Sequence, residues 1–150
     1  ELVGDLPRGK RLVVQLQETF REKMAPGFVD KLDAVALAEN AGLDLPPVMI
    51  YSDDLTHVVT EEGIAYLHKC TSMADRMAAI RAVAGFTEVG MAEDPAETAA
   101  LRERGIFKTP ADLGIDVRRA TRDMLAAKSV KDLVKWSGGL YNPPAKFRNW

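Results

Sequence analysis

The stretch Thr56–Leu67, THVVTEEGIAYL, decides how this chain should fold. Its β-branched run, His57–Thr60, predicts a short strand. Glu61, Glu62 and Gly63 follow, and the apolar residues after them predict the start of a helix. Strand–turn–helix junctions expose backbone N–H groups and place side chains at the carboxyl edge of a sheet, where the ligands of α/β proteins bind. The stretch therefore predicts a fold class and the place of a site together.

The adjacent carboxylates of Glu61 and Glu62 have two possible roles at this junction. One carboxylate could cap the following helix while the other faces a pocket, where partial burial would raise its pKa toward acid–base use. Alternatively, both are acids of the first helical turn that satisfy the helix dipole. The residues alone leave these two interpretations open.

The residues before this stretch predict strands joined by an irregular connector. Arg11–Phe20 alternates and predicts a strand, with a helical continuation through Glu22 as the alternative. A breaker at residues 24–27 is followed by an irregular or helical connector that ends near Gly42. The apolar run Val48–Tyr51 predicts a further short strand.

From Ser72 onward the sequence predicts helices. Ser72 is a suitable N-cap, and the helix after it should end by Gly85. Its apolar stripe predicts a core-facing side and consists of Met73, Met77, Ile80 and Ala84. Further helices are predicted from Asp94-Pro95 to Gly105, from Asp116, and from Ser129 to Gly138-Gly139, with a single turn from Thr109-Pro110 to Gly114 and no regular structure around Pro143-Pro144.

Strands early and helices late predict an α/β or α+β architecture with a small sheet, and the length predicts a single domain over residues 1–150. The apolar fraction of 47%, the charged fraction of 28% and the net charge of -2 are those of an ordinary globular protein. Because Lys and Arg alternate with Glu and Asp, we expect no nucleic-acid partner. No apolar run reaches the ~20 residues needed to cross a bilayer, so we expect no membrane association and a cytoplasmic location.

The residues that most often carry chemistry give few signals. Cys70 is the single cysteine, which excludes an internal disulfide, and it is expected to be a small packing residue. His57 and His68 lack the spacing of a metal site, and His57 is expected to be a hydrogen-bonded structural histidine. We therefore expect no metal site, and no phosphate-loop, dinucleotide or zinc-protease motif is present.

The two ends of the sequence differ in character. Glu1 rather than Met begins the chain, and its neighbourhood, ELVGDLPRGKR, is typical of the middle of a polypeptide. Residues 147–150 are typical of a natural terminus. We therefore expect the chain to be the carboxyl-terminal piece of a longer protein.

Four segments resemble the CoA-transferase-like family, and within it the group of malonate decarboxylase alpha subunits. These segments span nearly the whole chain: VVQLQETFREKMAPGFVDKLDA at 13–34, LPPVMIYSDDLTHVVTEEGIAYL at 45–67, RAVAGFTEVG at 81–90 and KDLVKWSGGLYNPPAKFRNW at 131–150. The pattern VVTE-x-G-[IV]-A-x-L is moderately specific, whereas the closing WSGGLYNPPAKFRNW is distinctive. The implied fold is the α/β sheet architecture of CoA-transferases, in two similar domains, with this chain as the last part of the second.

The resemblance implies an acyl-carrier-protein transferase that exchanges acetate for malonate on a carrier-protein thiol. The implied prosthetic group, phosphoribosyl-dephospho-CoA, belongs to the carrier protein, and we expect no cofactor on this chain. Partner subunits would decarboxylate the malonyl thioester, so the implied partners are carrier protein, decarboxylase subunits, malonate and acetate in an oligomer. A citrate-lyase-like alpha subunit, a CoA-transferase proper, and a non-catalytic docking module are the alternatives.

The catalytic acid and glycine-rich loop of the CoA-transferase family have no match in residues 1–55. Either these elements lie upstream of this chain, as we expect, or this type of subunit works without them. The catalytic residue is therefore unknown, and we expect the chain alone to be inactive. If the site lies beside the family motif, it would be lined by Thr60, Glu61, Glu62 and Gly63. Their backbone would bind pantetheine or phosphate oxygens, or a side chain would orient a carboxylate substrate.

Overall fold

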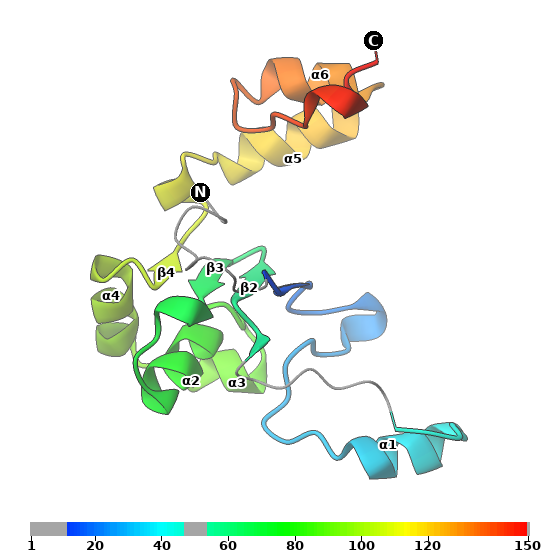
Figure 1. Ribbon diagram of the computed structural model, residues 1–150, viewed down its shortest axis with the longest axis vertical. Helices are drawn as coiled ribbons and strands as arrows, with labels where there is room; N and C mark the ends of the chain where they lie inside the picture. Colours follow the sequence, from blue (N-terminus) through cyan, green and yellow to red (C-terminus); the bar gives the residue numbers. More distant parts are fainter. Residues whose placement is uncertain (1–11, 47–53, 150) are drawn as a thin grey trace. The chain divides into compact units, whose positions relative to one another are not determined.

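The computed structural model describes residues 12–46 and 54–149, and the predicted strand Val48–Tyr51 lies outside these ranges. The chain divides into two compact units, Glu1–Lys108 and Thr109–Trp150. The first unit contains the sheet and the core, and the second consists of short helices (Figure 1).

A four-stranded mixed sheet organises the first unit. Its strands are β1 (Val14–Leu16), β2 (His57–Thr60), β3 (Gly63–Tyr66) and β4 (Phe107–Lys108), in the spatial order β1-β2-β3-β4. β1 runs parallel to β2, while β2–β3 and β3–β4 are antiparallel. The predicted strands within Arg11–Phe20 and at His57–Thr60 are confirmed, so the mixed α/β class with a small sheet is correct.

The helix predicted after Gly63 is wrong, because the chain forms a β-hairpin there. Thr60 pairs with Gly63, and the register continues to His57 opposite Tyr66. The apolar run GIAYL is too short to distinguish strand from helix by its pattern. Pairing with β2 on one side and β4 on the other satisfies its backbone groups and decides in favour of the strand. Helical structure begins only with the 3₁₀ turn η3 (Leu67–Lys69).

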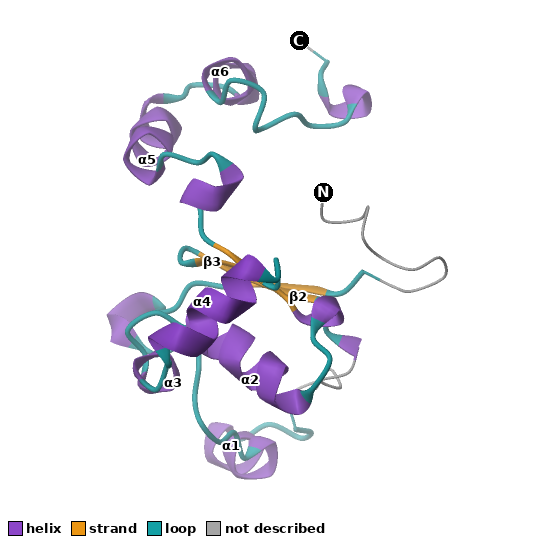
Figure 2. Cartoon of the chain, turned by 90° about the vertical axis from the view of Figure 1, so that its left-hand side faces the viewer, coloured by secondary structure: helices purple, strands orange, loops and turns teal. Residues whose placement is uncertain are grey.

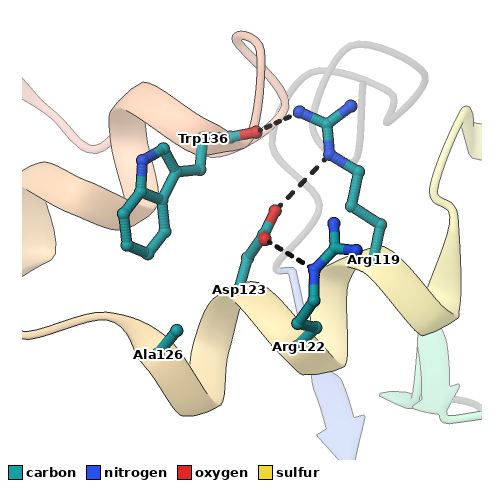
Figure 3. Close-up of a pocket in the computed structure, with 5 residues that line it drawn as sticks. All are labelled: Arg119, Arg122, Asp123, Ala126 and Trp136. Atoms are coloured by element: carbon teal, nitrogen blue, oxygen red, sulfur yellow. Dashed lines mark hydrogen bonds and ion pairs between the residues drawn. The ribbon is translucent and has the colours of Figure 1, made fainter.

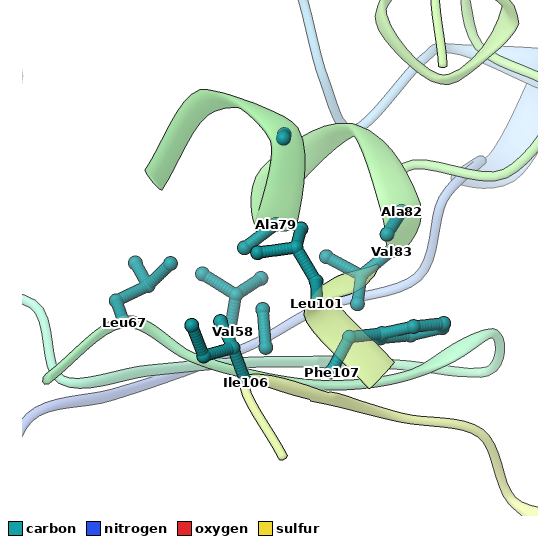
Figure 4. Packing of buried hydrophobic residues seen from close by; sticks show 10 residues of the cluster. Val58, Leu67, Ala79, Ala82, Val83, Leu101, Ile106 and Phe107 are labelled. Carbon is teal, nitrogen blue, oxygen red and sulfur yellow. The ribbon is translucent and has the colours of Figure 1, made fainter. Parts of the chain in front are cut away.

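The hydrophobic core lies between one face of the sheet and the helices α2 (Met73–Ala82) and α4 (Pro95–Glu103), as Figures 2 and 4 show. The strands contribute Val58 and Ala65, and helix α4 contributes Leu101, which is 2% exposed. The remaining buried members of the core are Leu67, Ala78, Ala79, Ala82, Val83, Ile106 and Phe107. The small side chains of α2 allow this helix to approach the sheet closely.

Helix α2 begins at the predicted N-cap, because the Ser72 side chain accepts a hydrogen bond from the Asp75 N–H at 3.1 Å. Its predicted core-facing stripe is partly wrong. Met73 and Met77 are 58% and 49% exposed, whereas Ala78, Ala79 and Ala82 lie in the core and Ala84, after the end of the helix, is buried. The helix therefore turns these smaller residues, and not its methionines, toward the sheet.

Shorter elements complete the first unit. They are the 3₁₀ turn η1 (Glu22–Met24), α1 (Ala34–Ala41) and α3 (Glu88–Met91). Helix α1 is capped at Gly42, whose φ of 66° is left-handed, and this agrees with the connector that was predicted to end near Gly42. Helix α4 begins at the predicted N-cap Asp94 and is followed by Gly105 with a φ of 68°.

The second unit contains the predicted single turn, η4 (Ala111–Leu113), then α5 (Val117–Ala126), α6 (Val130–Trp136) and the 3₁₀ turn η5 (Ala145–Phe147). Asp116 and Ser129 cap α5 and α6 as predicted, each accepting a backbone N–H three residues on. Both glycines after α6 adopt positive φ and end the helix. No helix in the described ranges has the length and apolar character needed to cross a membrane.

Candidate functional site

The four predicted site residues form the tip of the β2–β3 hairpin. Glu61 and Glu62 are the two loop residues between the paired Thr60 and Gly63. The four residues thus lie at one end of the sheet, and their role in lining a site stays a prediction. However, no helix begins there, so neither glutamate satisfies a helix dipole and that alternative is wrong.

Thr60 is a buried polar residue with two hydrogen bonds through its hydroxyl group. Its Oγ1 donates to the carbonyl oxygen of Val83 at 2.8 Å and accepts from the N–H of Glu62 at 3.1 Å. The first bond ties the hairpin to the end of α2, and the second fixes the loop. Since the Glu62 N–H is already bonded, this backbone donor is not available to an anion.

Glu61 fastens the hairpin tip to the segment that follows β1. Each of its carboxylate oxygens accepts from the Thr19 N–H at 3.1 Å, and one also accepts a short hydrogen bond from the Thr19 hydroxyl. Burial raises the pKa of Glu61, but the hydrogen bonds from Thr19 outweigh it and hold the pKa below its ordinary value. The predicted upward shift toward acid–base use is therefore wrong for Glu61, which stays ionised.

Replacing Glu61 by alanine is expected to destabilise the first unit by about 1–3 kcal/mol, because the buried Thr19 hydroxyl and N–H lose their acceptor. Glu62→Ala is the matched control on the same loop, and it should change stability by less than about 0.5 kcal/mol. Urea unfolding of the full-length subunit compares the two variants. Equal stability of both would show that the bonds to Thr19 contribute nothing.

Gly63 is required by the backbone rather than by a ligand. Its φ is 148°, and a Cβ atom there would lie 2.2 Å from the carbonyl oxygen of Lys108 on the neighbouring strand β4. Glu61 and Glu62 keep negative φ, so Gly63 alone takes up the unusual backbone conformation of the hairpin. Among the residues that the structure describes, the half-buried Glu62 side chain makes no hydrogen bond or ion pair.

A surface pocket of about 560 Å³ lies along the segment that Glu61 fastens. Its lining residues are Leu16, Gln17, Glu18, Arg21, Glu22 and Ala25. Buried Thr19 shares this segment and donates to Glu61. The pocket mixes both signs of charge with apolar carbon, and sequence reasoning missed it because the pairing of residues 19 and 61 is not encoded locally.

His57 and His68 come together in the structure although their spacing gave no sign of it. Their ring centroids are 4.8 Å apart, and His57 also packs edge-on against Tyr66 at 5.3 Å. The Thr56 hydroxyl donates to Val13, so its contact of 2.8 Å with His57 Nδ1 requires that nitrogen to carry the proton. The prediction of a hydrogen-bonded structural histidine is confirmed for His57, which is fully buried.

The pair of histidines does not extend to a metal centre among the described residues, where no three His, Cys, Asp or Glu side chains are placed to hold an ion. Burial, followed by the charges of His68 and Lys69, lowers the pKa of His57 from 6.5 to about 4. Cys70 packs against the core as predicted, and burial raises the pKa of its thiol.

The second unit contains a connected surface that the sequence did not reveal. Arg119 donates to the carbonyl oxygen of Trp136 at 3.0 Å, and this bond ties α5 to α6 (Figure 3). Within α5, Arg119 also pairs with Asp123 at 3.5 Å. A pocket of about 440 Å³ lies beside these residues and is lined also by Arg122 and Ala126. The only sequence signal was the run of arginines in α5 at helical spacing.

The fold and the hairpin together define a mixed α/β protein in which the residues of the motif form the turn between β2 and β3. A family model described as malonate decarboxylase, alpha subunit, transporter matches residues 1–150. The chain therefore belongs to the malonate decarboxylase alpha-subunit family, and the predicted resemblance is confirmed.

Relatives of known identity agree with this assignment. The chain is 74% identical over 149 residues to the acetyl-S-ACP:malonate ACP transferase of Malonomonas rubra, covering 99% of this chain and 27% of that protein. It is similar to the malonate decarboxylase alpha subunit of Acinetobacter baumannii, with a TM-score of 0.70 and 58% identity over 92% of this chain and 25% of that one. A Pseudomonas malonate decarboxylase hetero-tetramer in complex with malonate matches with a TM-score of 0.70 and 53% identity, covering 100% of this chain and 27% of that one. The chain thus spans about a quarter of the length of these relatives.

Proposed function

We propose that this chain is part of an acetyl-S-ACP:malonate ACP transferase, the alpha subunit of a malonate decarboxylase. The observation that carries the proposal is the 74% identity, across 99% of the chain, to the Malonomonas rubra protein of that activity. The family assignment favours this function over a citrate-lyase-like subunit or a CoA-transferase proper. The chain would be the last part of a two-domain, CoA-transferase-like subunit.

The proposed reaction exchanges the acyl group on a carrier-protein thiol. Malonate and the acetyl thioester give the malonyl thioester and acetate. The C–S bond to the acetyl group breaks, and one malonate carboxylate oxygen passes to the acetyl carbon. A new C–S bond then forms to malonyl, so neither an oxidant nor a reductant is needed. The phosphoribosyl-dephospho-CoA arm belongs to the carrier protein, so it is part of the substrate for this subunit.

The proposed assembly follows the similarity to the Pseudomonas hetero-tetramer. The subunit would work in the cytoplasm as one component of an oligomer whose decarboxylase subunits consume the malonyl thioester. The carrier-protein and decarboxylase subunits would be its protein partners, whereas malonate and acetate would be exchanged during each turnover. The catalytic acid would lie outside this chain.

Within this chain we place the substrate-lining role at the hairpin tip, and mainly on Glu62. Thr60, Glu61 and Gly63 are occupied by contacts to Val83, Thr19 and Lys108, and they would act as positioning residues. Glu62 is held in the same loop by the bond from its N–H to Thr60, while its side chain makes no hydrogen bond or ion pair with the described residues. Its carboxylate would orient the thioester arm through that arm's amide N–H groups.

Glu62→Ala in the full-length subunit is expected to raise the KM for acetyl carrier protein several-fold, because one acceptor for the thioester arm is lost, at unchanged stability. Steady-state acyl transfer measures the change, with Glu62→Gln as a conservative variant that should recover most of it. If the KM and kcat of Glu62→Ala match those of the wild type, the hairpin does not line the site. The non-catalytic alternative, a module that only docks partners, would then be favoured.

A further inference from the structure

The chain makes a left-handed turn at Glu22–Ala25, in the segment that follows β1. Lys23 and Met24, the central residues of this turn, each have a φ of 59°, and the Ala25 N–H donates to the Glu22 carbonyl oxygen. These are the features of a type I′ turn, which favours Asn followed by Gly because both central positions need a positive φ. In the described part of the chain, no other residue besides glycine adopts a positive φ. The turn is therefore strained.

Backbone hydrogen bonds on both sides of the turn hold it in this conformation. The Arg21 N–H donates to the Ala25 carbonyl oxygen at 2.8 Å, and the Gly27 N–H donates to the Thr19 carbonyl oxygen at 2.7 Å. We call the paired segment 19–27 the β1 loop. Its two arms impose the left-handed turn on two residues whose own conformational preferences oppose it.

The β1 loop lies at the same edge of the sheet as the hairpin tip. Because β1 and β2 are parallel, their carboxyl ends, at Leu16 and Thr60, lie at one edge. The loop follows β1, the hairpin tip follows β2, and the Glu61 carboxylate joins them by accepting from the Thr19 N–H and hydroxyl. Ligands of α/β proteins bind outside the carboxyl ends of parallel strands. The strained turn thus belongs to the edge at which we place the substrate.

The strain at Lys23 indicates that its side chain is needed there. An Asn-Gly pair would form the same turn without strain, so the hydrogen bonds of the loop do not explain the lysine. Residues held in rare backbone conformations cluster at ligand-binding sites, where the placement of a side chain outweighs the strain. Among the described residues, the Lys23 ammonium group makes no hydrogen bond or ion pair. A contact within this part of the fold therefore does not explain the lysine either.

The two acids of the proposed reaction differ by one carboxylate. One carboxylate of malonate becomes the thioester carbonyl, and the second stays ionised in malonate and in the malonyl thioester alike. Acetate and the acetyl group have no second carboxylate, so a cation beside the acyl group stabilises only the malonyl forms. Glu61 and Glu62 add negative charge at this edge, which makes a positive group necessary for binding a dicarboxylate there.

We propose that Lys23 is the substrate-binding residue that recognises the second carboxylate of malonate. This inference rests on the proposed function, because that function makes malonate and acetate the acids that the subunit must distinguish. The left-handed turn fixes the backbone of Lys23, and the ammonium group forms a charge-assisted hydrogen bond with the carboxylate. Lys23 determines specificity for the malonyl group and takes no part in the making or breaking of the C–S bonds.

The test uses the full-length subunit and the Lys23→Asn variant, because asparagine is favoured in this turn and removes only the charge. Its KM for malonate should rise about tenfold or more, since one partner of a charge pair is lost. Its KM for acetate, in the reverse exchange at saturating malonyl carrier protein, should stay within about twofold of the wild-type value. Lys23→Arg keeps the charge and should recover most of the KM for malonate.

Met24→Gly separates the strain of the turn from the charge. Glycine accepts the positive φ, so amide hydrogen exchange over residues 19–27 should become slower while both KM values stay unchanged. Lys31→Asn is the matched control, because it removes the same charge from the segment between the β1 loop and α1. It should leave the KM for malonate within about twofold of the wild-type value, since screening limits the effect of distant charges.

Three outcomes would overturn the role of Lys23: an unchanged KM for malonate in Lys23→Asn, an equal rise in its KM for acetate, or an equal rise for malonate in Lys31→Asn. Titration with malonate alone gives the dissociation constant apart from the transfer rate. A wild-type subunit that binds malonate but transfers no acyl group would refute the proposed function. Tighter binding of malonate by the wild type than by Lys23→Asn would then still support the role of Lys23, and equal binding would refute it.

Discussion

Replacing Gly63 by alanine is expected to disrupt the β2–β3 hairpin. The free energy needed to open the hairpin locally should fall by about 3 kcal/mol or more. The new Cβ would lie 2.2 Å from the Lys108 carbonyl oxygen and 3.0 Å from the Phe107 ring. Both atoms belong to β4, whose backbone is paired with β3. The strand would have to separate from its neighbour, and the φ of 148° adds backbone strain that an L-residue rarely tolerates.

Amide hydrogen exchange over residues 57–66 of the full-length subunit measures this opening directly, without requiring the whole protein to unfold in one step. Gly114→Ala is the matched control. It also places alanine at a positive φ, 76°, but with no atom within 4 Å of the new Cβ. It should cost only the left-handed conformation, about 1–2 kcal/mol. Equal protection loss at the two sites would show that the contact with β4 is unimportant.

Acidification is expected to destabilise the first unit through His57. Its pKa is about 4 in the folded protein against 6.5 for an unperturbed histidine, so the unfolded chain binds the extra proton more readily. The stability that the neutral His57 contributes to the folded protein is therefore fully present above pH 6.5, and it is lost as the pH falls toward 4. The loss reaches about 3 kcal/mol at the low end of this range. The cause lies in burial, since His57 Nε2 has no hydrogen-bond partner among the described residues.

Nuclear magnetic resonance of ring-labelled histidine in the full-length subunit gives this pKa, with the resonance assigned through His57→Gln. The same variant should unfold in urea with a weaker dependence on pH between 6.5 and 4, because a glutamine cannot take up the proton. A His57 resonance that titrates near pH 6.5 would contradict the structural interpretation.

The sequence predicted the helix starts well because their signals are local. Ser72, Asp94, Asp116 and Ser129 each bond a backbone N–H two or three residues on, so the information lies within one turn. That GIAYL forms a strand could not be predicted from its neighbouring residues. Its second neighbour, β4, lies more than 40 residues further along the chain, and only that pairing makes Ala65 a core residue.

The sequence predicted a turn after the strand His57–Thr60, and the structure has one at Thr60, Glu61, Glu62 and Gly63. That these residues line a site stays a prediction. What each side chain does depends on Val83, Thr19 and Lys108, which no pattern around the motif identifies. The same reason explains Met73 and Met77, whose exposure follows from the packing of small alanines against the sheet. Residues that read as functional in a short motif were here largely needed for its geometry.

The bond between Thr19 and Glu61 also has a kinetic consequence. It joins positions 42 residues apart, whereas the β2–β3 hairpin closes over a two-residue loop. Contacts between residues far apart in the sequence form late in folding, because closing the long loop between them costs conformational entropy. Loss of the Glu61 carboxylate should therefore speed unfolding and leave the refolding rate nearly unchanged. The contact between the hairpin tip and Thr19 would then form late in folding, and it would set the lifetime of the folded sheet.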